Sequence, residues 1–399
     1  MLVRKIAATY IFPGNRPPIK NGILICKTDG TIVDIIDNHG ELTEESGMEF
    51  YSGILTPGFV NAHCHLEFSY LQGKIAEHGG LGDFIGQINR LRNEEKEQVE
   101  KSIQVNDRKM WAAGIAAVGD VSNSTLTLET KQKSRIFYHT FVESFGFHPS
   151  RANKSFQTAQ AVFTAFTEKK LSASIVPHAS YSVSNALFEK IKTEAIQTKS
   201  VLSIHNQESE EEAEFFKTGT GAIANHLQKN LNIDISHYHP GGKSSLSIIL
   251  RQLPAQNRLL FVHNTFTKKD DLEEIRKNRS PENTHFVLCP NSNLFIENQL
   301  PPLSLFQNEK LNICLGTDSL ASNQQLSILA EMITLQQNFE NVELSELIKW
   351  ATINGAKALE IDEHFGSFDT GKNPGINLIT GIDLKTLKLN GNSKIKRLV

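Results

Sequence analysis

Cysteine is scarce in this chain of 399 residues, and nothing in its spacing suggests pairing. The four cysteines, Cys26, Cys64, Cys289 and Cys314, are scattered and form no C-x-x-C pair. A disulfide-rich secreted scaffold is therefore excluded, and we expect reduced thiols in a cytoplasmic protein. The first residues carry no apolar segment of signal-peptide length, and no apolar run approaches the roughly 20 residues that a membrane span needs.

The chain also lacks the charge bias and the phosphate-binding motifs of several function classes. Its net charge is -3, with both signs interspersed, which argues against a nucleic-acid or anionic-membrane partner. Neither G-x-x-x-x-G-K-[ST] nor G-x-G-x-x-G occurs, so nucleotide phosphates have no evident cradle. The combination of H-x-E with P-C-x-x-C found in small zinc deaminases is missing too. We expect a small-molecule substrate, with a homodimer as the protein partner to consider.

Short apolar, β-branched runs recur through the middle of the chain, each followed by a longer helical or looped stretch. This rhythm indicates βα units with a parallel sheet. Eight such units predict a closed (β/α)8 barrel with its active site at the C-terminal ends of the strands. The eight runs are Ile54–His63, Gly114–Asp120, Ile136–Glu143, Leu171–His178, Val201–His205, Leu259–His263, Thr284–Cys289 and Leu311–Thr317.

Both ends of the chain show a different pattern, in which short strand-like runs alternate apolar and polar positions. Gly22–Cys26 and Thr31–Ile36 flank a turn signal at Asp29–Gly30, as expected for a hairpin. Ile376–Ile379 is similar. We therefore expect a small β-sandwich domain built from residues 1–53 and 366–399, flanking a barrel of residues 54–365.

Nearly every barrel run ends in a polar or ionisable side chain. Charged and imidazole groups are costly to bury without partners. A ring of them at one barrel mouth therefore indicates a functional site. In chain order they are His63, His65, Asp120, Glu143, His178, His205, His263, Asn291 and Asp318.

A metal site is the interpretation that we favour for four of these residues. His63 and His65 point the same way because strand residues alternate faces, so Cys64 between them is expected to be a packed thiol. His205 and Asp318 supply a third imidazole and a carboxylate. Three or four protein ligands plus water are typical of a catalytic centre. The alternative is that the histidines are unrelated surface residues.

The ligand set predicts one divalent metal. Three imidazoles and a carboxylate suit Zn2+, with Fe2+ or Mn2+ as alternatives. The fourth run has no lysine near its end that could bridge two ions, which favours a single-metal site. Such a metal lowers the pKa of its bound water from 15.7 to about 7 and generates hydroxide. Asp318 is positioned to accept the proton of that water.

Three further residues are candidates for chemistry. Glu208, just beyond His205, is a candidate acid; the alternative is that it belongs to the solvated start of an acidic helix, which accounts well for Glu210–Glu212. His263 is a further ligand or a partner of the metal-bound water, or else a core histidine. His178 is a substrate contact or a structural hydrogen-bonding group.

The remaining histidines have no constellation around them. His237 and His239 flank a Pro-Gly-Gly turn, and the loop His237–Lys243 is a candidate cover for the site. Six more are expected to be ordinary structural or surface residues: His78, His139, His148, His226, His285 and His364.

The motifs together resemble the amidohydrolase superfamily over essentially the whole chain. Their order is similar to the branch that holds S-adenosylhomocysteine, methylthioadenosine, guanine and aminofutalosine deaminases and the triazine chlorohydrolases. Cys64 departs from this pattern, in which threonine is more common, and so does the turn Pro374–Asn377. The motifs that carry the resemblance are Thr56–His65, Pro177–Ala179, His205 with Glu208, His263, Cys289–Asn293 and Gly316–Asn323.

The resemblance implies a hydrolytic deaminase of an aminopurine nucleoside-like substrate. In that family pattern Glu208 protonates the ring nitrogen, His263 orients the hydroxide and Asp318 transfers its proton toward ammonia. The runs His65–Ser69 and Gly82–Ile85 most resemble the aminofutalosine deaminases. Candidate substrate contacts are Glu67, His178, Asn291, Asn293 and Ser319.

Two other functions remain open at this point. The same site could hydrolyse another C–N or C–Cl bond on a heterocycle. A third hypothesis is a non-catalytic barrel that binds a metabolite. The presence of a suitable residue at every expected catalytic position argues against it.

Overall fold

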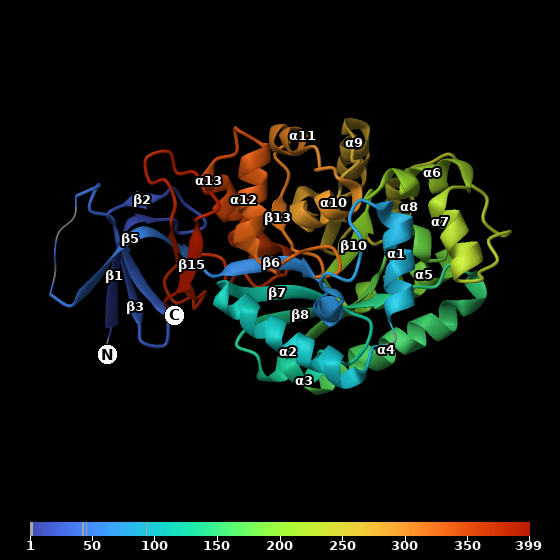
Figure 1. Ribbon diagram of the computed structural model, residues 1–399, viewed down its shortest axis with the longest axis horizontal. Helices are drawn as coiled ribbons and strands as arrows, with labels where there is room; N and C mark the ends of the chain where they lie inside the picture. Colours follow the sequence, from blue (N-terminus) through green and yellow to red (C-terminus); the bar gives the residue numbers. More distant parts are fainter. Residues whose placement is uncertain (1–2, 42–43, 45, 93) are drawn as a thin grey trace.

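The computed structural model describes residues 3–41, 44, 46–92 and 94–399. It shows an α/β protein with two regions, a β-sheet at one end and a larger body of alternating strands and helices (Figure 1). The first and last strands of the chain, blue and red in Figure 1, lie together in the smaller region. The body contains the candidate site.

The smaller region is one seven-stranded sheet built from both ends of the chain. Strand β5 is central to it, because β5 pairs in parallel with β1 and antiparallel with β14. Its side chains enclose a separate apolar core that includes Ile6, Leu24, Leu55 and Phe368. The strands are β1 (Val3–Ile11), β2 (Ile19–Lys20), β3 (Ile23–Lys27), β4 (Ile32–Ile36), β5 (Met48–Pro57), β14 (Ile376–Thr380) and β15 (Lys394–Arg397).

The body holds two four-stranded parallel sheets, as the apolar runs predicted. Almost all of their residues are buried, which explains why the runs are continuously apolar. One sheet consists of β6 (Phe59–Cys64), β7 (Ile115–Ser122), β8 (Phe137–Ser144) and β9 (Ser172–Pro177). The other consists of β10 (Leu202–Asn206), β11 (Leu259–His263), β12 (Thr284–Leu288) and β13 (Ile313–Leu315).

The two parallel sheets meet at both of their edges. At one junction the backbone nitrogen of His205 donates to the carbonyl of His178 at 3.0 Å. At the other, the backbone nitrogens of Thr317 and Asp318 donate to the carbonyl of His63 at 3.0 and 3.2 Å. The C-terminal ends of β6, β9, β10 and β13 are thereby held close to one another.

Helices follow the strands and pack against the sheets, joining them in one extensive apolar core. A second core lies between α1, α6, α7 and α10, beside the strand ends. The helices are α1 (Gly80–Leu91), α2 (Lys96–Ala112), α3 (Leu128–Lys133), α4 (Ala152–Glu168), α5 (Asn185–Thr198), α6 (Glu210–Thr218), α7 (Ala222–Asn225), the π-helix η4 (His226–Asn230), α8 (Ser245–Gln252), α9 (Lys269–Asn278), α10 (Pro290–Glu297), α11 (Leu303–Asn308), α12 (Ile328–Asn338), α13 (Leu344–Ala351) and α14 (Ile353–Ala358).

One boundary differs from the sequence-based expectation. The first apolar run is divided between two sheets, because Ile54–Pro57 completes β5 and the parallel sheet begins only at Phe59. Gly58 makes the break: a Cβ atom there would lie 2.4 Å from the carbonyl oxygen of Pro374. The chain therefore passes from the terminal sheet to the first parallel sheet at residue 58.

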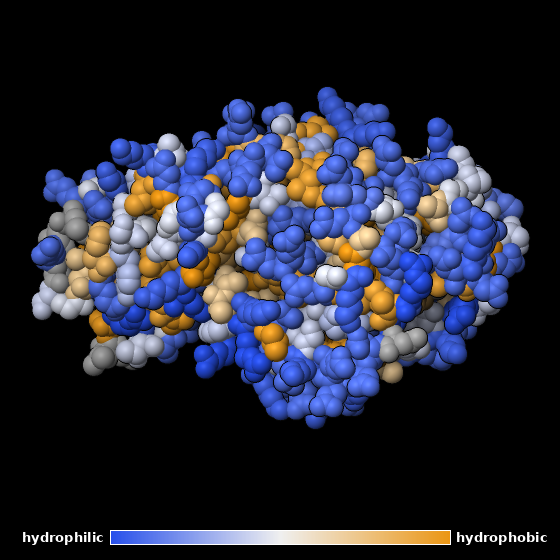
Figure 2. Space-filling model, viewed as in Figure 1, coloured by the Kyte–Doolittle hydropathy of each residue, from blue (hydrophilic) through white to orange (hydrophobic). Residues whose placement is uncertain are grey.

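Figure 2 shows one face on which hydrophilic side chains predominate, with small apolar groups between them. Within the described part of the chain, no helix combines the length and apolarity required to cross a bilayer.

Candidate active site

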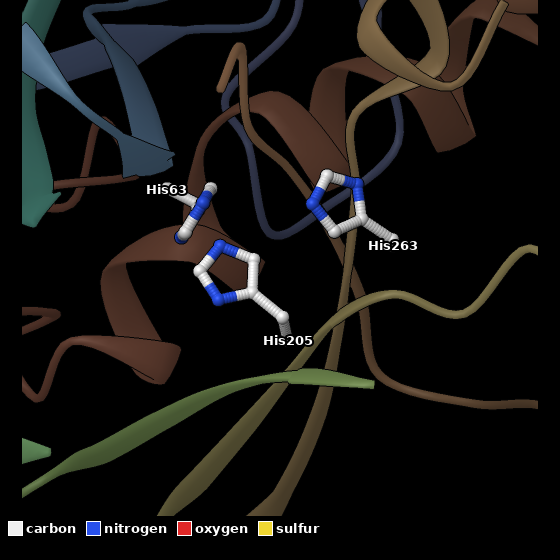
Figure 3. A group of neighbouring side chains, drawn as sticks. All are labelled: His63, His205 and His263. Atoms are coloured by element: carbon white, nitrogen blue, oxygen red, sulfur yellow. The ribbon is translucent and has the colours of Figure 1, made fainter. Parts of the chain in front are cut away.

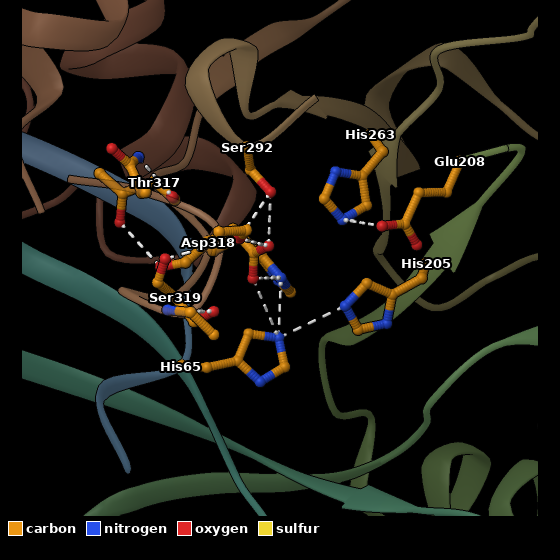
Figure 4. A network of polar contacts seen from close by, with 12 residues as sticks. His65, His205, Glu208, His263, Ser292, Thr317, Asp318 and Ser319 are labelled. Carbon is orange, nitrogen blue, oxygen red and sulfur yellow. Dashed lines mark hydrogen bonds and ion pairs between the residues drawn. The ribbon is translucent and has the colours of Figure 1, made fainter. Parts of the chain in front are cut away.

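Four donor atoms from three strand ends converge at one point, and Figure 4 shows three of the residues that supply them, His65, His205 and Asp318. The Nε2 atom of His65 lies 3.1 Å from Nε2 of His63 and 3.4 Å from Nε2 of His205. The Oδ1 atom of Asp318 lies 3.5 Å from Nε2 of His65 and 3.8 Å from Nε2 of His63. The structure thus brings together all four residues expected to bind a metal.

The spacing of these donors fits a single metal ion. Ligands of a tetrahedral zinc ion lie roughly 3.3 Å from one another, because each is about 2.0–2.1 Å from the metal. Imidazole nitrogens at this spacing can share one cation, because each unprotonated nitrogen offers a lone pair to the metal. Burial, followed by the charges of the neighbouring imidazoles, lowers the pKa of His63 well below its ordinary value. The neutral form is the one that binds metals.

The imidazole of His205 is oriented by its second ring nitrogen. Its Nδ1 lies 2.8 Å from the carbonyl oxygen of His178, so Nδ1 carries the proton and donates it. Nε2 is then left with a free lone pair toward the donor cluster, the arrangement found around metal-binding histidines. His263 approaches from the next strand, and Figure 3 shows its ring beside those of His63 and His205. One ligand atom from each of these three lies within 4.8 Å of the others.

The backbone at the strand ends is held in uncommon conformations. Gln207, His263 and Asp318 have positive φ angles of 46°, 73° and 55°. Such conformations cost of order 1–3 kcal/mol each for residues other than glycine and cluster at functional sites. Gly316 is required for a related reason, because a Cβ atom there would lie 2.9 Å from Cβ of His63.

Two hydroxyl groups orient the carboxylate of Asp318. Ser292 and Ser322 each donate to Oδ2 at 2.7 Å, which leaves Oδ1 facing the histidines. Burial opposes the charge, but His65, His263 and the two hydroxyls outweigh it and lower the pKa of Asp318 below its ordinary value. Asp318 is therefore a carboxylate at neutral pH, as a metal ligand must be.

Glu208 and His263 form the second part of the site. Oε1 of Glu208 lies 3.5 Å from Nε2 of His263, and Nδ2 of Asn293 lies 3.4 Å from Nδ1 of the same ring. Burial, followed by the negative charge of Asp318, raises the pKa of Glu208 well above its ordinary value. Burial is also the main reason why the pKa of His263 falls to about 3. The site therefore places a carboxyl group whose protonated form is favoured by its surroundings beside a neutral imidazole.

The turn that carries Glu208 is built by residues of the following helix. Ser209 caps α6, accepting from the backbone nitrogen of Glu212 at 3.1 Å. The side chain of Glu212 turns back and accepts from the backbone nitrogens of Gln207 and Glu208. Glu210 is exposed, as expected for a solvated helix start. The same expectation was wrong for Glu212, which is buried.

A cavity of about 240 Å³ opens over His65, His205 and Asp318. Its base is polar and includes His65, Glu143, His178, His205, Glu208, His263, Asp318 and Ser319. Its outer walls are mostly apolar and include Phe68, Phe84, Ile88, Phe147, Tyr181 and Leu227. A cavity of this kind, apolar with a few convergent polar groups, is typical of a small-molecule site.

The residues expected to contact substrate lie in different places. His178 and Ser319 line the cavity. Asn293 is buried and reaches the site through His263. Both carboxylate oxygens of Glu67 accept protein hydrogen bonds, from the backbone nitrogen of Asn123 and the hydroxyl of Ser124. Asn291 lines a different depression and accepts from Thr334 at 2.6 Å.

Several residues that the sequence left without a role belong to this site. Glu143 lies next to the end of β8, with its Oε1 3.7 Å from Nδ1 of His205. His226, expected to be an ordinary histidine, lines the cavity from the π-helix η4, a local distortion frequent at functional sites. The loop His237–Lys243 lies behind the wall, where the ring of His237 packs 5.4 Å from that of Phe147.

A buried ion pair supports the first strand end. Nζ of Lys131, on α3, lies 2.6 Å from Oδ2 of Asp120, and neither side chain is accessible to solvent. The other oxygen of Asp120 accepts from the backbone nitrogen of Leu66 at 2.8 Å. Leu66 follows His65 directly, so this pair fixes the backbone beside a metal-site histidine. The sequence identified Asp120 as a polar residue at a strand end, but it did not predict that Lys131 on α3 would be its partner.

Comparisons with known proteins agree with this geometry. A sequence model of the amidohydrolase family matches residues 54–397. The chain is 29% identical to an adenosine deaminase of Helicobacter pylori over 317 residues, covering 78% of this chain and 76% of that one. It is 25% identical to an aminodeoxyfutalosine deaminase of Nitratiruptor over 346 residues, covering 82% and 79%. The structure of the aminofutalosine deaminase of Helicobacter pylori in complex with methylthio-coformycin superposes with a TM-score of 0.83 at 24% identity, covering 99% of this chain and 100% of that one.

Proposed function

Because this chain belongs to the amidohydrolase family, we propose that its site hydrolytically removes the amino group of an aminopurine nucleoside, with aminodeoxyfutalosine among the candidates. The observation that carries the proposal is the pairing of the four-donor cluster with the buried Glu208, whose Oε1 lies 3.5 Å from Nε2 of His263. Burial also raises the pKa of Glu208, which favours its proton-carrying form. Hydrolysis of a cyclic amidine requires a Lewis acid, a proton donor for the ring nitrogen and a base.

We assign the metal site to His63, His65, His205 and Asp318. A divalent metal held there, for which the nitrogen-rich donor set favours zinc, would act as a Lewis acid and lower the pKa of a water molecule. Asp318 offers Oδ1 to that site while Ser292 and Ser322 occupy Oδ2. Its carboxylate is thus placed to take up a proton and pass it to the departing ammonia.

Glu208 and His263 act on the substrate side of the donors. Glu208 lines the base of the cavity and holds the proton that a purine ring nitrogen accepts when the adjacent carbon is attacked. His263 stays neutral and orients the attacking water, with Asn293 holding its other nitrogen. His178 and Ser319 line the same cavity and are the candidates for direct substrate contacts.

We also propose a closed barrel and a companion β-domain as the architecture around this site. The hydrogen bonds at both sheet junctions support a single closed eight-stranded barrel. The separate core of the terminal sheet supports a sandwich-like companion domain. We propose that residues 1–57 and 366–399 form this domain and that the protein works in the cytoplasm on a small molecule, with a homodimer as the assembly to test.

The test is an ammonia-release assay of the zinc-loaded protein. The panel is aminodeoxyfutalosine, methylthioadenosine, S-adenosylhomocysteine, adenosine and guanine, with Glu208→Gln as the matched variant. We expect release from at least one nucleoside, abolished in Glu208→Gln while the bound zinc is retained. Glutamine keeps the size of the side chain and removes the transferable proton, so this result would assign the proton donor.

Two other outcomes would change the proposed proton donor or the proposed reaction. Activity that survives Glu208→Gln would show that another group protonates the ring. Absence of release across the panel with zinc bound would refute the deamination of aminopurines and favour hydrolysis of a different C–N or C–Cl bond at the same centre.

A further inference from the structure

Glu331 is a buried acidic residue to which the proposed mechanism assigns no role. It lies on α12 and its side chain is 0% exposed. Burial raises its pKa to about 8, because removal from water disfavours the charged form. A carboxyl group in such a place destabilises the fold unless hydrogen bonds compensate for the lost solvent. The partners of these hydrogen bonds therefore indicate what the residue does.

Each oxygen of Glu331 holds a different segment of the chain. Oε2 accepts from the backbone nitrogen of Asn291 at 2.9 Å, in the first turn of α10. Oε1 accepts from Nδ2 of Asn323 at 2.8 Å, in the turn between β13 and α12. The same Nδ2 atom also donates to the carbonyl of Thr317 at 2.9 Å. One carboxyl group thus links the start of α10 to the turn that carries Asp318.

The two partners of this carboxyl group are direct neighbours of the serines that orient the metal-site carboxylate. Asn291 precedes Ser292, and Asn323 follows Ser322. Both hydroxyls donate to Oδ2 of Asp318 at 2.7 Å, and the two hydroxyl oxygens lie 2.8 Å apart. Figure 4 shows the hydroxyl of Ser292 directed at this carboxylate. The carboxyl group on α12 therefore fixes the positions of both hydroxyls and, through them, the direction of Oδ1.

A purely structural interpretation explains only one of these contacts. The first backbone N–H groups of a helix have no partner within the helix, so a carboxyl group that accepts from Asn291 stabilises the start of α10. The contact with Asn323 has a different result, because this side chain also holds the backbone directly before Asp318. Glu331 does not line the cavity, so it can affect the reaction only through the groups that it holds.

We propose that Glu331 is a positioning residue for Asp318, acting through the two serine hydroxyls. This inference rests on the proposed function, which makes Asp318 a metal ligand and a proton carrier. Residues that orient a ligating group typically contribute about 10–100-fold to metal affinity or activity. Replacement of Glu331 by glutamine keeps the size of the side chain and turns one accepting oxygen into an N–H donor. One of the two holding contacts is then lost, and Oδ1 loses its fixed direction.

A double-mutant cycle on zinc affinity tests this coupling without any substrate. The zinc dissociation constant is measured by competition with a chromophoric chelator in wild type, Glu331→Gln, Asp318→Ala and the double variant. We expect Glu331→Gln to weaken zinc binding about tenfold or more. In the Asp318→Ala background the same change should alter the dissociation constant by less than about twofold, because its target is absent. Glu340→Gln, at an exposed position just after α12, is the control and should bind zinc as wild type does.

Steady-state kinetics at full zinc loading separate this role from general damage. We expect Glu331→Gln to lower kcat about tenfold or more and to leave KM unchanged, because the lining of the cavity is intact. Asn323→Ala removes one holding contact and keeps the carboxyl group. It takes the place of Glu331→Gln in the cycle if that variant does not fold, and it should weaken zinc binding in the same way.

A wild-type zinc affinity in both Glu331→Gln and Asn323→Ala would overturn the proposal. So would an equal loss of affinity with and without Asp318, or a change confined to KM. Ammonia release from the same samples bears on the proposed function alone. Coupling in the cycle without release would retain the role of Glu331 and refute deamination, whereas release by wild type without coupling would do the reverse.

Discussion

The carboxylate of Glu212 accepts hydrogen bonds from the backbone nitrogens of Gln207 at 3.3 Å and Glu208 at 3.0 Å. The hydroxyl of Ser180 donates to the same carboxylate at 3.2 Å. One buried side chain on α6 therefore fixes the turn that carries the proposed proton donor, and it does so without lining the substrate cavity.

Replacing Glu212 by glutamine should impair catalysis without removing the metal. The amide group would place an N–H donor against one of the backbone N–H groups and displace the turn. A displacement of about 1 Å at a catalytic group costs on the order of 100-fold in rate. We expect a fall of that size in kcat, with zinc content unchanged. Glu210→Gln, on the exposed face of the same helix, is the control, and a wild-type kcat in Glu212→Gln would remove its positioning role.

The pH dependence of the reaction follows from Glu208. Burial and the charge of Asp318 raise its pKa well above the ordinary value. The protonated acid therefore persists to a higher pH than for an ordinary glutamate and is lost as the pH rises through that raised pKa. We expect kcat/KM to decline on the alkaline side with the slope of a single ionisation. A profile that rises steadily through the alkaline range would exclude a protonated Glu208 from the rate-determining chemistry.

Metal removal should lower stability as well as activity. Ligand binding to the folded state alone stabilises it by about 4 kcal/mol when free ligand exceeds its Kd a thousandfold. We expect one zinc ion per chain by elemental analysis and a lower Tm after treatment with a chelator. His63→Ala should contain little zinc, whereas His364→Ala, at an exposed position, should contain as much as wild type. Full zinc occupancy in His63→Ala would contradict the ligand assignment.

The ion pair between Lys131 and Asp120 should matter for stability. Both side chains are inaccessible to solvent, and the removal of one partner leaves an uncompensated buried charge that costs about 3–5 kcal/mol. We expect Lys131→Met to lower the free energy of unfolding by that amount in urea titrations. Lys133→Met, in an exposed pair on the same helix, should have no measurable effect. A small loss in Lys131→Met would show that Asp120 finds another partner or takes up a proton.

The parallel strands and the converging donors were predictable from sequence for one physical reason. Strands buried on both faces are continuous apolar runs, and parallel strands end at the same side of a sheet. Polar residues at the ends of those runs therefore had to meet, as His63, His205 and Asp318 do. The division of the first run at Gly58 was not predictable, because it depends on a contact with Pro374, far away in the sequence.

Residues that act through tertiary packing escaped the sequence pattern. Glu212 and Glu210 stand in the same acidic run, and only the position of Ser180 and the preceding turn makes one of them buried. Glu67 looked available for substrate beside the first histidines, yet Asn123 and Ser124 from the next loop occupy its oxygens. The hydrophobic periodicity and the composition of a sequence do not predict such hydrogen bonds between distant segments.

The position of β5 in the terminal sheet sets an order of events during synthesis. Every proposed metal ligand has left the ribosome once residue 318 has emerged, but the partner of β5 on one side, β14, begins only at Ile376. Until then β5 exposes an unpaired edge, which is a template for aggregation. A nascent or truncated chain can thus contain all four proposed metal ligands while the edge of β5 is still unpaired and prone to aggregate. Pairing with β14 therefore protects the protein from self-association.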